Sequence, residues 1–187
     1  MKYLYCLGGR DMGGRPARVA VACALALGWI MGAVSTEAAA PHTRTRKAVS
    51  VTQAVEQQVL KLLNADRAAN GLGPLQFSVR LTMVARAHSA DMAWRSYFAH
   101  VTPEGRTAFQ RMAQAGIYYS MAGENLGMAS GYPPLRAARV IEAQMMAEPP
   151  NQENHRAIIL SRALHTVGVG VRLTARGTIY ITEDFTN

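Results

Sequence analysis

Three ionisable side chains occupy positions where functional groups tend to concentrate. His100 lies in Phe-Ala-His-Val-Thr-Pro at the end of an expected helix, Glu124 lies in Gly-Glu-Asn directly after an expected strand, and His155 begins a short expected helix. Binding and catalytic residues are common at such edges and in the adjoining loops. Imidazole and carboxylate together suit proton transfer or the coordination of a divalent ion. From spacing alone, however, each of these residues is more typical of a cap or a solvated surface.

Common local signatures of catalysis do not occur in the sequence. It has no H-E-x-x-H zinc motif, no G-x-S-x-G nucleophile elbow, no P-loop and no EF-hand calcium loop. Both cysteines, Cys6 and Cys23, lie in the first 40 residues, so the rest of the chain has no disulfide, thiolate ligand or cysteine nucleophile. The absence of these local motifs does not exclude a site assembled from side chains that are distant in the sequence.

Apolar periodicity, caps and turn residues predict the elements that must position such a site. Helices are expected over 52–70, with Thr52 as the cap, and over 78–95, 107–115, 133–148 and 154–160; strands are expected over 117–122, 166–173 and 178–185. The last two strands are joined by Thr-Ala-Arg-Gly and read as a hairpin. Because helices come first and a hairpin comes last, the order predicts an α+β fold with an antiparallel sheet covered by helices.

The first 40 residues have the layout of a secretory signal. Arg15 and Arg18 precede an apolar run over 19–34, and small residues follow at 38–40. The alternative is an uncleaved membrane anchor, although the run is shorter than the ~20 residues that a span needs. Met12 is an alternative start, and Pro41 leaves the cleavage position open. We expect a flexible lead-in over 41–50 and one domain over 51–187.

The positive charge of the chain is concentrated in its N-terminal part. The formal net charge is +8, but residues 1–50 contain seven of the 20 basic and two of the 12 acidic residues, which leaves a surplus of three over 51–187. A nucleic-acid-binding domain would be expected to present a basic face. No nucleic-acid partner is therefore expected.

Several motifs follow one another in an order that resembles the CAP superfamily (cysteine-rich secretory, antigen five and pathogenesis-related one proteins, which share the SCP domain), in its bacterial branch without cysteines. The resemblance covers about residues 55–187. Its motifs stand at 62–67, 87–93, 98–105, 123–126, 155–160, 167–171 and 180–185. Each motif is weak alone, but their order is specific.

The resemblance implies an α-β-α sandwich, with a central antiparallel sheet flanked by helices, and an open cleft in which two histidines and two glutamates converge. The matching residues are His100, Glu124, Glu148 and His155. Glu148 depends on matching residues 145–148 to a motif in which Met145 replaces the family's tryptophan. Zinc or another divalent cation could be bound by these four side chains; alternatively, they form a hydrogen-bonded network without metal.

Two functions are compatible with this resemblance. The first is a secreted binding module, periplasmic or extracellular, for a divalent metal or for a small-molecule, lipid or cell-envelope ligand, with no stable membrane span once the signal is cleaved. The second is a hydrolase acting on peptide or cell-wall glycan, in which either a metal-bound water attacks or Glu124 is the general base. Glu183 adds a further carboxylate where the family usually has glutamine. The absence of an activated nucleophile favours the binding module.

Overall fold

The computed structural model describes residues 6–7, 49–150 and 154–187, and all of these belong to one compact unit of the chain. The predicted export signal over 1–40 lies outside the described residues except for Cys6 and Leu7. The predicted lead-in over 41–50 lies outside them except for its last two residues. No helix in the described ranges is both long and apolar enough to cross a membrane.

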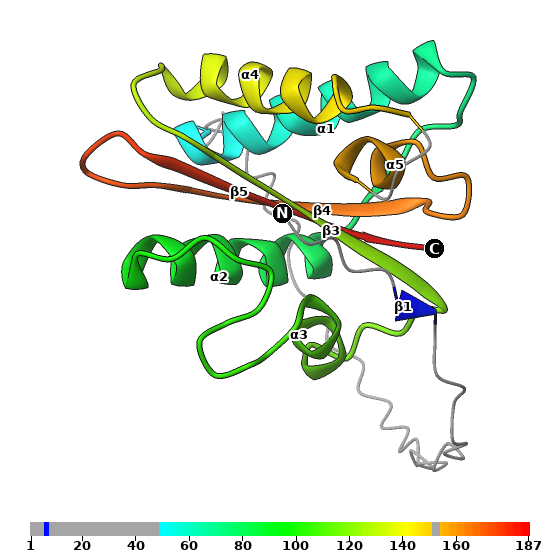
Figure 1. Cartoon of the computed structure of the whole chain (residues 1–187), viewed down its shortest axis with the longest axis horizontal. Coiled ribbons are helices and arrows are strands. Elements are labelled where there is room, and N and C mark those ends of the chain that lie inside the picture. The colour runs from blue at the N-terminus through cyan, green and yellow to red at the C-terminus, as the bar shows by residue number, and fades with distance from the viewer. Residues whose placement is uncertain (1–5, 8–48, 151–153) are drawn as a thin grey trace, which may run out of the picture. The chain divides into compact units, whose positions relative to one another are not determined.

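A five-stranded sheet forms the middle layer, in the spatial order β1-β3-β5-β4-β2 (Figure 1). Its strands are β1 (Cys6–Leu7), β2 (Gln76–Phe77), β3 (Met121–Ala129), β4 (Thr166–Leu173) and β5 (Ile179–Thr186). β5 pairs antiparallel with β3 on one side and with β4 on the other, and β1 pairs antiparallel with β3. The short β2 runs parallel to β4, which the sequence did not predict.

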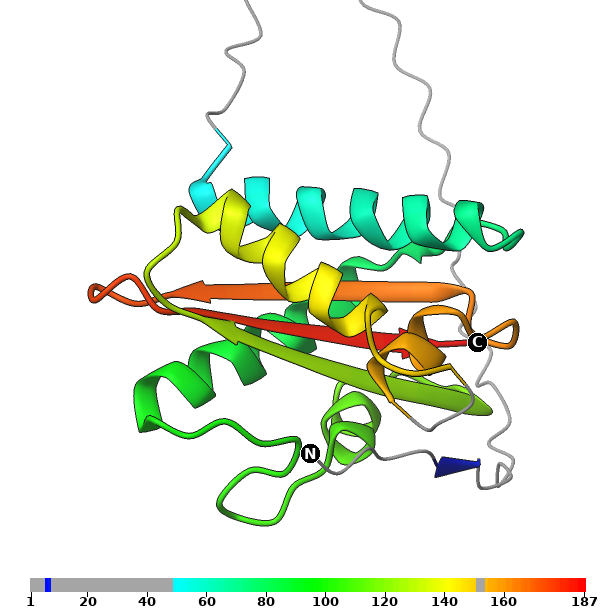
Figure 2. The same ribbon diagram turned by 45° about the horizontal axis from the view of Figure 1, so that its top comes forward.

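Helices cover both faces of the sheet. They are α1 (Val51–Ala69), α2 (Val79–Arg95), α3 (Ala108–Gln114), α4 (Pro134–Met146) and α5 (His155–Ile159). α1, α4 and α5 lie on one face, and α2 and α3 lie on the other (Figures 1 and 2). α1 and α4 pack side by side above the sheet (Figure 2). The predicted α+β class and the α-β-α sandwich are therefore confirmed.

Capping side chains fix where the helices begin. Ser78 caps α2, as the sequence predicts, and Thr107, expected as the first residue of its helix, is instead the cap of α3. The cap of α1 is Ser50, however, so the prediction of Thr52 was wrong. The Ser50 hydroxyl accepts a hydrogen bond from the backbone N–H of Gln53, whose side chain accepts one from the N–H of Ser50. Ser50 prevails because Gln53 stands three residues after it and completes this reciprocal capping box.

β3 begins and ends later than predicted. The expected strand over 117–122 and the placement of Glu124 after it were both wrong, because Glu124 lies inside β3, opposite Asp184 of β5. Gly123 and Gly127 weaken the strand signal in the sequence. In the fold these glycines permit close packing, since a Cβ on Gly127 would lie 2.4 Å from Cγ2 of Ile141 in α4. Pairing with β5 overrides their low strand propensity.

The Val-Gly-Val-Gly-Val pattern of β4 separates its two faces. Val167, Val169 and Val171 belong to the main hydrophobic cluster, which also contains residues of α1, α4 and α5. Gly168 and Gly170 point the other way, where a Cβ would lie 2.2 Å and 2.0 Å from backbone atoms of α2. Alternation along the strand thus supplies core side chains on one face and close contact with a helix on the other.

Replacing Gly170 by alanine should destabilise the protein strongly. The new methyl group would overlap the backbone of α2, which cannot rotate away as a side chain could. We expect Gly170→Ala to lower the free energy of unfolding by about 3 kcal/mol or more, measured by urea denaturation. The control is Gly73→Ala, where no atom lies within 4 Å of the new Cβ; its effect should stay within about 0.5 kcal/mol. Equal stability of the two variants would contradict the packing of α2 on β4.

Candidate functional site

His100 and Glu124 form the first pair of predicted site residues. Nδ1 of His100 lies 2.8 Å from Oε1 of Glu124, whose side chain is only 3% exposed. Arg111 of α3 forms an ion pair with the other carboxylate oxygen. Its guanidinium also donates to the backbone carbonyl of His100 over 2.9 Å, so it holds both members of the pair. Both carboxylate oxygens of Glu124 therefore have partners.

The surroundings of Glu124 keep this carboxylate ionised. Burial alone would raise its pKa, but the hydrogen bond from His100 and the positive charge of Arg111 outweigh burial and hold the pKa below its usual value. Its cross-strand neighbour Asp184 behaves in the opposite way. Burial and the negative charge of Glu124 raise the pKa of Asp184 well above its usual value. Both influences favour the protonated form of Asp184 over its ionised form.

Glu148 and His155 form the second pair. Nδ1 of His155 lies 2.7 Å from Oε1 of Glu148, and the backbone N–H of His155 donates to Oε2 over 2.8 Å. α4 ends at Met146, earlier than predicted, so Glu148 stands in the following loop and reaches the start of α5. Asn154 caps α5 through the N–H of Ala157. The loop and the cap together fix the imidazole of His155 beside its carboxylate.

The two pairs lie on opposite sides of β3. Glu124 shares a face with Asp184 and Gly168, and that face contacts α2. Asn125, the next residue, faces the other layer, where its amide donates to the carbonyl of His155 over 3.4 Å. The structure therefore brings the four predicted residues together two by two. Among the residues it describes, no three His, Cys, Asp or Glu side chains gather as a metal ion would require.

A cleft of about 420 Å³ opens at the edge of β3. It is lined by Phe98, Leu126, Gly127, Met128, Ile141, Gln144 and Met145, together with Glu148 and His155. β1 covers only Met121 and Ala122 of this edge, so within the described residues the strand edge at the cleft has no strand partner. The cleft combines an apolar lining with one polar pair. Phe98, two residues before His100, also brings the loop of the first pair to the rim.

Sequence reasoning missed several residues of this region. Arg111 gave no signal, because its role depends on α3 packing against β3. Ile141 and Met145 could have been found, since residues four apart on a helix share a face. Both are buried at 4% exposure in the main hydrophobic cluster and also line the cleft.

Two carboxyl groups are buried close to the backbone of His155, on the same side of the sheet as Asn125. Glu142 of α4 and Glu183 of β5 interact with each other, and the amide of Asn125 donates to Glu183 over 3.1 Å. Burial raises the pKa of both carboxyls, and the charge of Glu183 raises that of Glu142 further. When one proton lies between the two carboxyl groups, the protonated carboxyl donates a hydrogen bond to the other, which two ionised carboxylates could not form. Glu183, the further carboxylate noted in the sequence, is therefore buried beside Glu142.

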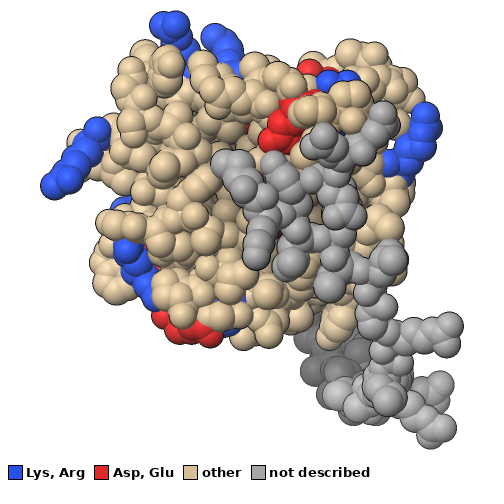
Figure 3. All heavy atoms as spheres, viewed as in Figure 1, with Lys and Arg blue, Asp and Glu red and all other residues tan. Residues whose placement is uncertain are grey.

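Positive charge does not form a single patch on the face of the described residues that Figure 3 shows. On the face seen in Figure 3, lysines and arginines are spread around the outline instead of forming one patch. Several arginines are also engaged: Arg86 pairs with the buried Glu56, and Arg67 donates to four backbone carbonyls. The lack of a nucleic-acid partner stays a prediction.

Comparison with known proteins identifies relatives of this fold and site. The model of the cysteine-rich secretory protein (CAP) family matches residues 60–185. The uncharacterised protein YkwD of Bacillus subtilis (strain 168) is 38% identical over 126 residues, which are 67% of this chain and 46% of that protein. The chain thus spans less than half the length of this relative.

Solved structures show the same architecture. An extracellular protein containing an SCP domain, from Bacillus anthracis str. Ames, is 26% identical with a TM-score of 0.59, and the match covers 73% of this chain and 41% of that one. An outer surface protein from Borrelia burgdorferi is 18% identical with a TM-score of 0.61, over 73% of this chain and 94% of that one. At 18% identity this second likeness shows the fold alone.

The buried pair of Glu142 and Glu183 should make stability depend on pH. A glutamate in the unfolded chain ionises near pH 4.3, whereas burial keeps a proton on the folded pair at higher pH. Folding therefore takes up a proton, and the free energy of unfolding falls as the pH rises above about 4.5. Glu142→Gln should flatten this slope in urea denaturation and raise the free energy of unfolding at pH 8 by about 1 kcal/mol.

The control for this experiment is Glu104→Gln. Its hydrogen bond with Arg95 holds the pKa of Glu104 at about 2, so this change should leave the slope above pH 5 as it is. A Glu142→Gln variant that keeps the wild-type slope would mean that the pair is ionised in the folded protein.

Proposed function

The chain belongs to the cysteine-rich secretory protein family, and from this premise we propose that it is an exported binding module and not an enzyme. Export is supported by the predicted signal over residues 1–40 and by a solved relative that is an extracellular protein. Either the periplasm or the cell exterior fits this proposal. The ligand is a component of the cell envelope, and its apolar part enters the cleft at the edge of β3.

The composition of the cleft carries this proposal. Phe98, Ile141 and Met145 offer apolar contact, and the pair of Glu148 and His155 lies beside them. Small-molecule sites commonly combine an apolar lining with a few polar groups that fix orientation. The imidazole is already held by its carboxylate and by the cap of α5, so a ligand would meet a preorganised polar group. Such preorganisation lowers the entropic cost of binding.

The geometry of Glu124 favours binding over hydrolysis. A general base must accept a proton from water or substrate, and an effective one has a pKa near the working pH. Both oxygens of Glu124 are already bound, one by His100 and the other by Arg111, and its pKa is lowered. Its arrangement suits a structural ion pair that holds α3 and the loop of His100 against β3.

A divalent cation is a second proposal for the same four side chains. In each pair a carboxylate holds Nδ1 of the imidazole, an arrangement that orients metal-binding histidines in metalloproteins. The two pairs would together offer two imidazole ligands, one from His100 and one from His155. Structural zinc sites use four protein ligands and catalytic zinc sites use three. A zinc ion shared by all four side chains therefore requires the two pairs to approach each other.

Blocking the cleft should remove the binding of an apolar compound. N-phenyl-1-naphthylamine, an uncharged dye that fluoresces in apolar surroundings, should bind the wild-type protein. Gln144→Trp places an indole in the cleft and should raise the Kd at least about tenfold, which corresponds to about 1.4 kcal/mol. Ala143→Trp adds the same indole at the neighbouring exposed position, which does not line the cleft, and should leave the Kd unchanged. Equal Kd values for the two variants would refute ligand binding in the cleft.

The absence of catalysis is tested with casein and purified cell wall. Wild-type protein, with or without added divalent metal, should release no product from either substrate. Turnover that disappears in Glu124→Gln would replace the binding module with the hydrolase.

Calorimetric titration with zinc chloride at pH 7.5 tests the second proposal. A shared site binds one equivalent, and its affinity should fall at least about tenfold in both His100→Ala and His155→Ala. His165→Ala, an exposed histidine outside both pairs, is the control and should bind zinc as the wild type does. Zinc affinity that survives in either of the first two variants would rule out a shared site.

A further inference from the structure

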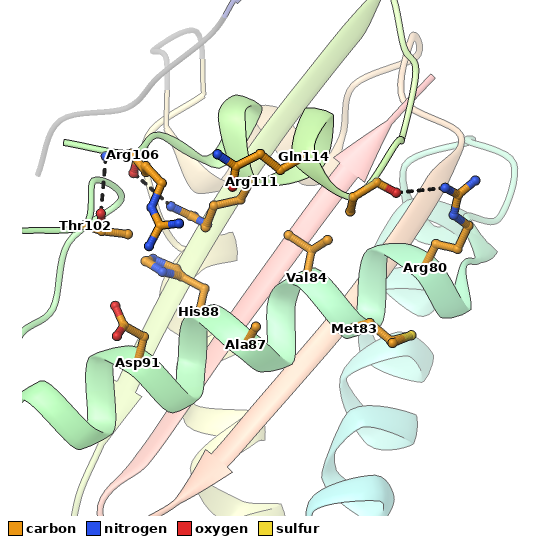
Figure 4. A pocket seen from close by; sticks show the side chains of 11 residues that line it. Arg80, Met83, Val84, Ala87, His88, Asp91, Thr102, Arg106, Arg111 and Gln114 are labelled. Carbon is orange, nitrogen blue, oxygen red and sulfur yellow. Dashed lines mark hydrogen bonds between the residues drawn. The ribbon is translucent and has the colours of Figure 1, made fainter. Parts of the chain in front are cut away.

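A second cavity lies away from the cleft, between α2, α3 and the loop that joins them. Its volume is about 580 Å³, within the range of small-molecule sites. Figure 4 shows its lining side chains, which come from α2 on one side and from α3 with the preceding loop on the other. The cavity thus belongs to the layer of α2 and α3 and shares no lining residue with the cleft.

The middle of this cavity is apolar. Val84 and Ala87 of α2 face Ala115 beyond the end of α3, and Met83 stands at one end with 64% of its surface exposed. Met83 and Asp91 are both lining residues and stand eight positions apart on α2, about 12 Å along the helix axis. The cavity is therefore elongated along α2 and suits a hydrocarbon segment laid parallel to the helix.

Cationic side chains border this apolar middle. Arg80 donates to the backbone carbonyls of Ala115 and Gly116, and Arg111 is paired with Glu124. No acidic partner of Arg80 or of the exposed Arg106 occurs among the described residues.

The acidic residue in the lining does not neutralise these two arginines. Asp91 accepts a hydrogen bond from the hydroxyl of Tyr97 over 2.5 Å and pairs with Arg95. The cavity therefore presents uncompensated positive charge, which favours an anionic ligand.

His88 lies at the end of the cavity where Arg106 and Arg111 stand, and one of its ring nitrogens has no hydrogen-bond partner among the described residues. It rises from α2 toward Arg106 and Arg111 (Figure 4) and is only 1% exposed. One ring nitrogen, Nε2, lies 3.0 Å from the carbonyl of Ala99 and donates to it. Burial lowers the pKa of His88 to about 4, so its ring is neutral at physiological pH.

The other ring nitrogen of His88, Nδ1, is buried and has no partner among the described residues, and the same is true of Nε of Arg111. Buried polar atoms are nearly always hydrogen-bonded in folded proteins. Both atoms are themselves buried beneath the cavity wall, and Nδ1 of the neutral ring can only accept a hydrogen bond. An anion in the cavity must therefore be held by other groups.

We propose that this cavity is a second ligand site, separate from the cleft, that binds a small amphipathic anion. The carboxylate or phosphate head lies beside the exposed Arg106, whose guanidinium forms charge-assisted hydrogen bonds with anionic oxygens. The hydrocarbon tail lies along Val84 and Ala87 toward Met83. An anion of this kind buries apolar surface and neutralises an unpaired arginine at once.

Octanoate and octyl phosphate test the proposal, with uncharged octyl glucoside as the control for the tail alone. In calorimetric titrations of the whole protein, at least one of the two anions should bind and octyl glucoside should bind at least tenfold more weakly. Which anion binds more tightly identifies the head group as carboxylate or phosphate. Equal affinity for octyl glucoside and both anions would overturn the assignment of an anion site.

Variants locate the bound anion. Ala87→Trp fills the cavity from an exposed helix position and should abolish binding. Arg106→Gln should weaken it at least tenfold, while Arg176→Gln, an exposed arginine that does not line the cavity, should leave it unchanged. Unchanged affinity in both Ala87→Trp and Arg106→Gln would overturn the proposal.

The cleft variant separates this inference from the proposed function. Gln144→Trp should leave anion binding unchanged, because Gln144 lines the cleft and not this cavity. Loss of anion binding in Gln144→Trp together with full binding in Ala87→Trp would place the anion in the cleft and refute a second site.

Discussion

Neighbouring residues of a β-strand point to opposite faces of its sheet, and in β3 this alternation decides where the side chains of the candidate site lie. Glu124 points toward α2 and α3, where His100 and Arg111 meet it. Asn125 points toward the other layer and contacts the backbone of His155. One strand therefore serves two polar networks that share no face of the sheet.

Each network is built mainly from side chains of its own layer. A buried carboxylate is tolerated only with charged or hydrogen-bonded partners, and Glu124 has both kinds. The glycines of β4 let α2 approach the sheet closely, which brings His88 near Arg111 and Glu124. On the other face, Glu183 stands opposite the core residue Val169, where burial raises its pKa and favours a proton shared with Glu142. The cleft lies where both layers end, at the edge of β3.

Much of the fold could be predicted from the sequence, because its helices have local signals. Ser78 and Thr107 are caps that act over three residues, and the valine-glycine alternation of β4 marks a strand with one crowded face. β3 was placed too early because Gly123 and Gly127 resemble a loop until their close packing against helices is known.

The candidate site was less accessible to sequence reasoning than the helices. The resemblance to a family identified His100, Glu124, Glu148 and His155. Their division into two pairs could not be predicted while Glu124 was placed outside a strand, since only strand alternation separates them. Arg111 was missed because its contacts are entirely tertiary.

The central claim is that the two His–Glu pairs are independent of each other. ¹⁵N chemical shifts of the imidazole nitrogens report which nitrogen carries the proton and respond to the partner of Nδ1. In the wild-type protein at neutral pH, His100 and His155 should both carry the proton on Nδ1, facing their carboxylates. Glu124→Gln should change the nitrogen shifts of His100 and leave those of His155 unchanged, and Glu148→Gln should do the reverse. If either substitution altered the shifts of both histidines equally, the four side chains would form one cluster, which would contradict the independence of the two pairs.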